Sequence, residues 1–353
     1  MNKNNWLWSG VVVLVMIIIL ALSFDSAKDD SKTENKLIKI GIVTDLTGQA
    51  GYWGESTRAG AELAKTELAE EGYKVELVFE DYQLDPAKAL TAAQKLINAD
   101  QVDAIYAEFN PAAITISSFL KEQKPILFVY DAAPESPLQT SPYVYKSYLD
   151  FHKGCHELAQ TFRDQGIDKI GLLKLNWETT DICIKGLEEV YQKDKIVTEA
   201  YNFGDADVHT QVLKLKNQNV GAVVNVTLPA ETLTSLKAIK DINWSVPYGT
   251  ETDAIIPDIE KIYAKELKDA EIFGFKPVDA SFVQKLDKDL ISYEGAALAY
   301  THIKQMAKAI GQCDQDMDCV VKKMDSSPAS SAISFNRFIN HIANFDLVVN
   351  KHQ

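Results

Sequence analysis

Residues 38–64, with the sequence IKIGIVTDLTGQAGYWGESTRAGAELA, decide the fold class of this chain. The β-branched run at 37–43 predicts a buried strand, and apolar residues at helical spacing over 55–70 predict a helix directly after it. Further strands are expected at 73–81, 103–107 and 125–130. Helices are expected between them, one of them opening at Pro86. This βαβ alternation is typical of a parallel sheet with helices on both faces.

A second unit with the same alternation follows residues 141–150. Its strands are expected at 169–175, 195–202, 219–226 and 246–251. A long periodic helix is expected at 292–310, and a strand-rich tail ends the chain at 332–338 and 344–350. The chain has 353 residues, which is enough for two lobes that each bury a core. We therefore expect an α/β fold of two lobes in series.

The N-terminus carries an apolar stretch from Trp6 to Phe24, and Lys3 is the only charged side chain before it. The stretch is long enough to cross a bilayer core of about 30 Å. Its small residues at Ala21 and Ser23 form a poor cleavage site, and no cysteine is near to accept a lipid. We favour an uncleaved anchor over a cleaved signal peptide. The basic N-terminus is then expected on the cytoplasmic side of the cell membrane and the lobes on the extracytoplasmic side. One transmembrane helix would precede the fold.

The formal net charge of −14 disfavours nucleic acid and anionic membrane surfaces as partners. The four cysteines are compatible with an exported protein. Cys313 and Cys319 flank a short polar segment, and we expect them to form a disulfide. Cys155 and Cys183 are either a second pair or two buried thiols, because spacing alone does not decide between them.

Ligands of open α/β sheets bind beyond the carboxyl ends of the strands. That rule directs attention to the loops at 44–53, 108–111, 130–135, 176–180, 227–230 and 250–253.

These loops carry a resemblance to a known family. Residues 38–64, DYQLDPAKALTAAQKLI at 81–97 and PILFVYDAAPE at 125–135 resemble the branched-chain amino-acid-binding proteins, the type I periplasmic solute receptors of ABC importers. The resemblance implies two Rossmann-like lobes, three crossovers between them and a cleft that closes on a small-molecule ligand. It implies an ABC permease as partner, and no cofactor. We expect 1–36 to be anchor and tether. The lobes are expected at 37–149 plus 252–325 and at 150–251 plus 326–353.

In the first lobe, the resemblance places an aromatic wall for the ligand at Trp53. Asn110 and Ala132 fall where the family often has hydroxyl residues that hold the ligand carboxylate. Asp131 precedes Ala132, and with Glu108 it is expected to face the cleft. Trp53 is otherwise an exposed aromatic at a helix start, and Asp131 is otherwise a cap of the next turn.

In the second lobe, the aromatic that follows the first strand falls near Trp177 or Thr179, and Leu228 replaces a tyrosine of the family. The acid that holds a ligand ammonium matches Glu251, whose alternative role is a solvated helix cap. With the hydroxyl residues replaced, backbone amides at helix N-termini remain to hold an anion.

Two metal motifs are incomplete. His152 and His156 lie four residues apart, but no further zinc ligand stands out. The segment CDQDMDC at 313–319 has alternating aspartates but lacks the glycine of a calcium loop. We therefore expect no metal.

Motifs of dinucleotide-binding, P-loop, hydrolase and metalloprotease enzymes are missing, and we expect no catalysis. The favoured function is the capture of an amino acid or a similar small polar ligand for an ABC importer. The alternative is the membrane-tethered sensing module of a signalling system, and an enzyme with an unmarked site ranks last.

Overall fold

The computed structural model describes residues 36–286, 289–314 and 316–352. The predicted membrane segment at 6–24 and its tether lie outside these residues. None of the helices in the described part of the chain is long and apolar enough to cross a membrane. Leu37–Gln353 form one compact unit, which contains both lobes.

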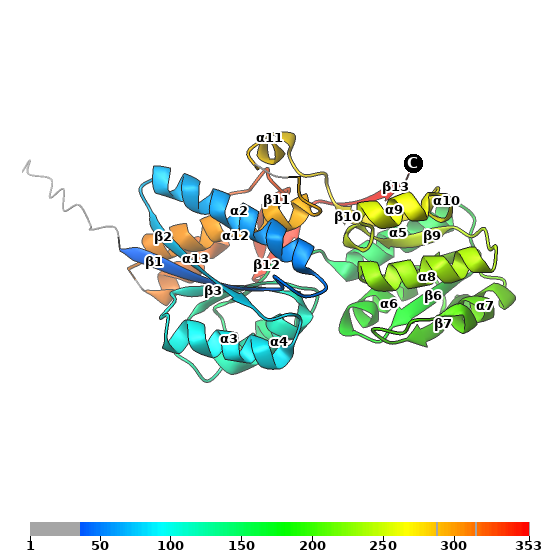
Figure 1. Ribbon diagram of the computed structural model, residues 1–353, viewed down its shortest axis with the longest axis horizontal. Coiled ribbons are helices and arrows are strands. Elements are labelled where there is room, and N and C mark those ends of the chain that lie inside the picture. The colour runs from blue at the N-terminus through cyan, green and yellow to red at the C-terminus, as the bar shows by residue number, and fades with distance from the viewer. Residues whose placement is uncertain (1–35, 287–288, 315, 353) are drawn as a thin grey trace, which may run out of the picture. The chain divides into compact units, whose positions relative to one another are not determined.

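The first lobe is built on a seven-stranded sheet with the order β11-β12-β5-β4-β3-β1-β2. Its strands are β1 (Leu37–Thr44), β2 (Lys74–Asp81), β3 (Ala104–Glu108), β4 (Leu127–Asp131), β5 (Val144–Lys146), β11 (Phe335–Ile339) and β12 (Ile342–Phe345). Its helices are α2 (Gly51–Glu70), α3 (Pro86–Asn98), α4 (Phe109–Leu120), the short η1 (Ser136–Gln139), α12 (Tyr293–Gly311) and α13 (Met317–Asp325). Helix α2 packs on α12, and α3 packs on α4 on the other face of the sheet (Figure 1).

The second lobe is built on a six-stranded sheet with the order β13-β10-β9-β8-β6-β7. Its strands are β6 (Ile170–Leu175), β7 (Ile196–Tyr201), β8 (Ala222–Val224), β9 (Tyr248–Glu251), β10 (Glu271–Phe275) and β13 (Leu347–Lys351). Its longer helices are α5 (Phe151–Asp164), α6 (Glu178–Val190), α7 (His209–Asn217) and α8 (Pro229–Asp241). The shorter ones are η2 (Lys193–Lys195), η3 (Thr252–Ala254), α9 (Pro257–Ile262) and α10 (Ala264–Leu267), and α11 (Ala280–Val283) follows β10. Helix α5 packs on α6, and α7 packs on α8.

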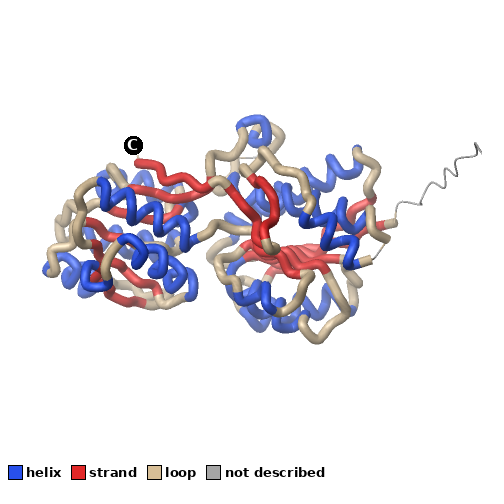
Figure 2. The backbone as a smooth tube through the Cα atoms, turned by 180° about the vertical axis from the view of Figure 1, so that it is seen from behind, coloured by secondary structure: helices blue, strands red, loops and turns tan. Residues whose placement is uncertain are grey.

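The prediction of parallel sheets is confirmed except where the tail of the chain adds strands. The pairs β11–β12 and β10–β13 are antiparallel, and the other pairs that the structure describes are parallel. Figure 2 shows the tail strands running along both lobes.

Within the described residues the chain passes between the sheets three times, after β5, after β10 and between β12 and β13. The predicted lobe boundaries at 252 and 326 differ from this arrangement. Strand β10 pairs with β9 of the second sheet, and β12 pairs with β5 of the first. The first lobe therefore contains β11 and β12, and only β13 of the tail joins the second. An alternating strand pattern shows which face is buried, but not which sheet an edge strand joins.

All four cysteines form disulfides in the structure. Cys155 and Cys183 join α5 to α6, so the alternative of two buried thiols is wrong. Cys313 and Cys319 close the turn between α12 and α13.

Helix α2 is fixed in place by a close approach to α12. A Cβ atom at Gly60 would lie 1.9 Å from the backbone oxygen of Ala296, so a larger residue there would push the helices apart. This contact holds the helix that carries Trp53.

Candidate ligand cavity

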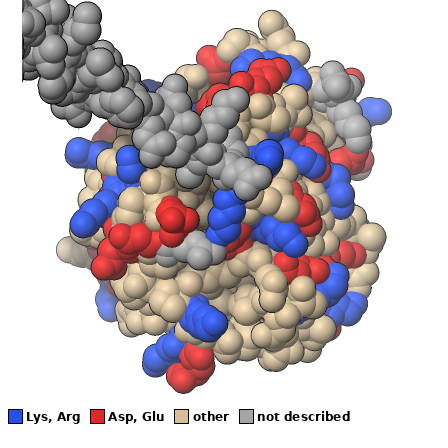
Figure 3. All heavy atoms as spheres, turned by 90° about the vertical axis from the view of Figure 1, so that its left-hand side faces the viewer, with Lys and Arg blue, Asp and Glu red and all other residues tan. Residues whose placement is uncertain are grey.

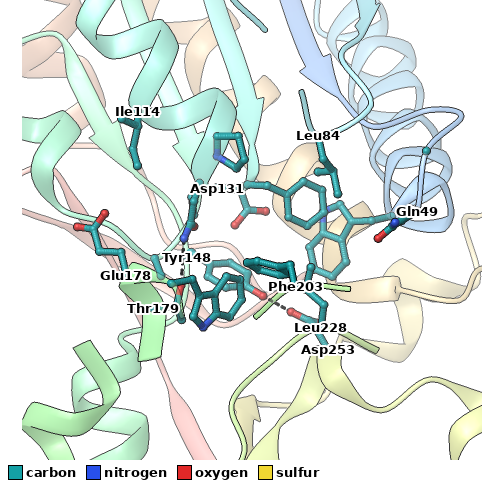
Figure 4. Close-up of a pocket in the computed structure, with 18 of the residues that line it drawn as sticks. Gln49, Leu84, Ile114, Asp131, Tyr148, Glu178, Thr179, Phe203, Leu228 and Asp253 are labelled. Carbon is teal, nitrogen blue, oxygen red and sulfur yellow. Dashed lines mark hydrogen bonds between the residues drawn. The ribbon is translucent and has the colours of Figure 1, made fainter. Parts of the chain in front are cut away.

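A cavity of about 650 Å³ lies between the two lobes. Its lining residues come from segments that follow each of the strands β1 to β9, which is where the strand-end rule predicts a site. The volume is in the range of pockets that bind small molecules. Figure 4 shows side chains from both lobes converging on it.

All seven residues proposed from the sequence line this cavity. They are Trp53, Asn110, Asp131, Ala132, Trp177, Thr179 and Glu251. The replaced tyrosine position, Leu228, also lines it. That these residues contact a ligand stays a prediction.

Glu108 was expected to face the cleft, and this prediction is wrong. The side chain is fully buried behind Trp53 and does not line the cavity. Its carboxyl group accepts hydrogen bonds from the hydroxyls of Thr44 and Thr57. The indole Nε1 of Trp53 donates to Glu108 Oε1 at 3.0 Å. Burial raises the pKa of Glu108 to about 7, although these three donors lower it. The carboxyl group thus fixes the orientation of the Trp53 ring.

Trp53 is only 3% exposed, so its alternative as an exposed aromatic is wrong. Its ring lies 6.1 Å from that of Phe109 and 6.4 Å from that of Tyr148, centroid to centroid. Phe109 adopts a positive φ of 66°, an uncommon conformation for a bulky residue that here begins α4 at the cavity. The three rings form a rigid aromatic wall of the first lobe.

A hydrogen bond links the two lobes at the cavity. The Asn110 side chain, at the start of α4, donates from Nδ2 to Thr179 Oγ1 at 3.1 Å, at the start of α6. Trp177 beside it donates from Nε1 to Thr180 Oγ1. The ring of Trp177 lies 5.4 Å from that of Phe203 in a T-shaped arrangement, which forms the wall of the second lobe.

Two carboxyl groups at the cavity, those of Asp131 and Glu251, are buried, and that of Asp253 is half-buried. Burial raises the pKa of Asp131, and its Oδ2 accepts one long hydrogen bond of 3.3 Å from Tyr106. Burial, followed by the charge of Asp253, raises the pKa of Glu251. Burial also raises the pKa of Asp253, which accepts a hydrogen bond from the Tyr148 hydroxyl (Figure 4).

Glu251 lines the cavity and also caps a helix, but it is only 3% exposed, so the alternative of a solvated cap is wrong. Its carboxylate accepts a hydrogen bond of 2.7 Å from the backbone N–H of Asp253, at the start of η3. Capping the helix and lining the cavity are therefore compatible roles.

Sequence reasoning missed several lining residues, chiefly Phe109, Tyr148, Phe203 and Asp253. Phe203 follows β7, so extending the strand-end rule to that loop would have found it. Asp253 lay within an inspected loop but was not singled out. Tyr148 lies where the chain crosses between the lobes, and no local pattern marks it.

The rejected metal motifs have other partners in the structure. His152 and His156 contact the two carboxylate oxygens of Glu189 at 3.0 and 3.1 Å. Asp316 caps α13. Over the described residues, no group of three or more His, Cys, Asp or Glu side chains is arranged to hold a metal ion.

The profile of the family described as "Periplasmic binding protein" matches residues 37–348, which is nearly all of the described chain. The chain belongs to this family. It is a non-enzymatic family, in agreement with the missing catalytic motifs.

The binding protein is 26% identical over 166 residues to the Leu/Ile/Val-binding protein homolog 6 of Brucella abortus. That match covers 45% of this chain and 40% of the relative, so it spans less than half of the relative's length. A leucine-binding protein from Thermotoga maritima has a similar solved structure, with a TM-score of 0.77, 19% identity and coverage of 90% of this chain and 95% of that one. A solute-binding protein of an ABC transporter from Rhodopseudomonas palustris, solved with 4-hydroxybenzoate, is also similar. Its TM-score is 0.79 at 16% identity, and the match covers 90% of this chain and 93% of that one. At these identities the structures establish the type I periplasmic binding protein fold.

Proposed function

We propose that this binding protein captures a small polar ligand, an amino acid or a similar solute, between its lobes and delivers it to an ABC permease. Its apolar N-terminal segment holds it at the cell membrane, with the lobes on the extracytoplasmic side. The relatives support this role, because one is named as a Leu/Ile/Val-binding protein homolog, one as a leucine-binding protein, and one was solved in complex with 4-hydroxybenzoate.

The observation that carries the proposal is a cavity whose two walls belong to different lobes and are incompletely covered. Ile114 of α4 is 39% exposed and Phe203 of the second lobe is 49% exposed, although both line the cavity. A ligand that contacts both walls favours a closed arrangement, because only contacts made to both lobes at once shift that equilibrium. Closure would remove these apolar side chains from water.

A ligand screen followed by scattering tests the proposal. The protein is screened by thermal shift against amino acids, amides, polyamines and nucleosides, and each stabilising compound is then added in small-angle X-ray scattering. We expect a smaller radius of gyration with ligand. If no compound that binds causes compaction, the closing mechanism is refuted.

Phe203→Ser tests whether an exposed apolar side chain of the cavity wall contributes to ligand binding more than one elsewhere on the surface. If closure covers the exposed half of a ring of about 200 Å², at about 25 cal/mol per Å², the loss is up to about 2.5 kcal/mol of binding free energy. Leu213→Ser in α7 is the matched control, because Leu213 is 43% exposed and lies outside the lining. Calorimetry should show weaker binding for Phe203→Ser only, and equal affinities in both variants would contradict the site.

A further inference from the structure

The cavity is acidic on the inside. Its lining contains Asp131, Glu178, Glu251 and Asp253 but, among the described residues, no Lys, Arg or His. In Figure 3, by contrast, acidic and basic side chains are interspersed over the face shown. Glu178 lies at the rim with its carboxylate turned outward, whereas that of Asp131 points inward (Figure 4).

The inner carboxyl groups have only neutral partners. Asp131 contacts the Tyr106 hydroxyl, Asp253 contacts the Tyr148 hydroxyl, and Glu251 accepts from a backbone N–H. In the part of the chain that the structure describes, no Lys or Arg forms an ion pair with any of the three carboxyl groups. A buried carboxylate is costly unless a cation pairs with it. The protein supplies no such cation here among the described residues, so a positively charged ligand would complete the site.

The missing partner is clearest at Asp131. Its side chain is 4% exposed, and Oδ1 has no hydrogen-bond partner. A buried acceptor that is left unsatisfied destabilises the folded state and is rare in folded proteins. An N–H donor from a ligand in the cavity would satisfy it.

Aromatic rings surround the carboxyl groups. Seven of the lining residues are aromatic, namely Tyr52, Trp53, Phe109, Tyr148, Phe151, Trp177 and Phe203. The faces of such rings attract organic cations, and the attraction is stronger once the cation is removed from water. Rings and carboxylates together are a binding surface for an apolar cation.

A ligand carboxylate would find no cationic side chain among the described residues that line the same cavity. The Asn110 amide donates to Thr179, and the indole N–H groups of Trp53 and Trp177 donate to Glu108 and Thr180. Helices α2, α3, α4, α6 and α8 begin at the lining, so an anion finds only the partial positive charges of their N-termini. Three carboxyl groups share the cavity with these partial charges, and among the described residues no Lys, Arg or His lines it, so the site favours a cation.

We infer that the ligand is an organic amine with an apolar or aromatic body and no carboxylate, bound as a cation between the aromatic walls with its N–H groups donating to Asp131, Glu251 and Asp253. This inference rests on the proposed solute-binding function and narrows its ligand class. It separates this cavity from a site for leucine or for 4-hydroxybenzoate, whose carboxylates would face unpaired acids.

Two sets of matched compounds test the inference by calorimetry at pH 8. One is 3-methylbutylamine, leucine and 4-methylpentanoate; the other is phenethylamine, phenylalanine and 3-phenylpropanoate. Within each set the apolar side chain is constant, and the charged groups change from an ammonium alone, to an ammonium with a carboxylate, to a carboxylate alone. We expect the amine of at least one set to bind at least tenfold more tightly than its amino acid, and the acid not to bind.

Asp131→Asn locates the effect. This variant should weaken amine binding at least tenfold, while Asp258→Asn, at an exposed position of α9 outside the lining, should leave it unchanged. If in neither set the amine binds at least tenfold more tightly than its amino acid and its acid, the inference is overturned, but binding of any of these compounds leaves the solute-binding function standing. If neither amine binds, the inference is overturned, and the wider screen with scattering decides the proposed function separately.

Discussion

Glu108→Gln tests whether the buried acid behind the cavity wall is held protonated by the fold. Burial raises the pKa of Glu108 from its ordinary value of 4.5 to about 7, and the charge of Asp45 contributes in the same direction. Between these pH values the folded protein holds a proton that the unfolded chain releases. The contribution of Glu108 to stability is therefore fully present below pH 4.5 and is lost as pH rises through about 7.

The size of the change in the free energy of unfolding follows from the difference between the pKa values of Glu108 in the unfolded and the folded protein. Each pH unit between the two pKa values is worth about 1.4 kcal/mol, so the free energy of unfolding should fall by about 3 kcal/mol from pH 4 to pH 8 on account of Glu108 alone. The Gln amide has nearly the same shape and keeps an oxygen for Trp53 Nε1, but it does not titrate. Subtracting the variant's stability curve from that of the wild type should isolate this pH-dependent fall.

Urea unfolding of wild type and variant across pH 4 to 8 is the assay. Other buried acids, Asp131, Glu251 and Asp253 among them, act with the same sign in both proteins and cancel in the difference. Glu76→Gln, at an exposed position of β2, is the control and should leave the curve unchanged. Parallel curves for wild type and Glu108→Gln would refute the conclusion that Glu108 is protonated in the folded protein near neutral pH.

Two further predictions concern the covalent chain. Replacing both Cys313 and Cys319 by Ser should lower the free energy of unfolding by about 2 kcal/mol, because the bond closes a loop with a sequence separation of 6. Two freely alkylated thiols at these positions in non-reduced mature protein would contradict it. The apolar segment at 6–24 should be retained in protein isolated from a native-like host, because its cleavage site is poor. N-terminal sequencing that finds a chain beginning near Phe24 would show instead that the segment is a signal peptide.

The position of the cavity was predictable from the sequence because it follows from the order of strands. Once βαβ units are recognised, the loops after their strands must gather at the carboxyl ends of the sheets, which is how Trp53 and Glu251 came to be placed together. The direction in which a side chain points was less predictable. Glu108 and Asp131 end neighbouring strands, yet Glu108 turns into the core under α2 and Asp131 turns into the cavity. That difference depends on the packing of a helix distant in sequence.

The tail of the chain shows a second limit of sequence reasoning. Its strands were recognised from their alternation, but their assignment to the lobes was wrong for β11 and β12. Only Asp346 separates β12 in one sheet from β13 in the other. Nothing in a short alternating segment specifies which of two available sheet edges it joins, because both edges offer the same backbone groups.

The acidic composition took on meaning only once its distribution was known. An excess of 50 acidic over 36 basic side chains says little about a ligand, since a solvated surface accommodates it. Inside the cavity the same excess has two linked consequences. Burial favours the protonated forms of Asp131, Glu251 and Asp253, so rising pH lowers the stability of the free protein as these groups ionise. Ionisation is also what makes the cavity attract a cation, so affinity for an amine should rise over the same pH range. A bound amine thus stabilises the charged form that the empty site disfavours, and stability and affinity change with pH in opposite directions.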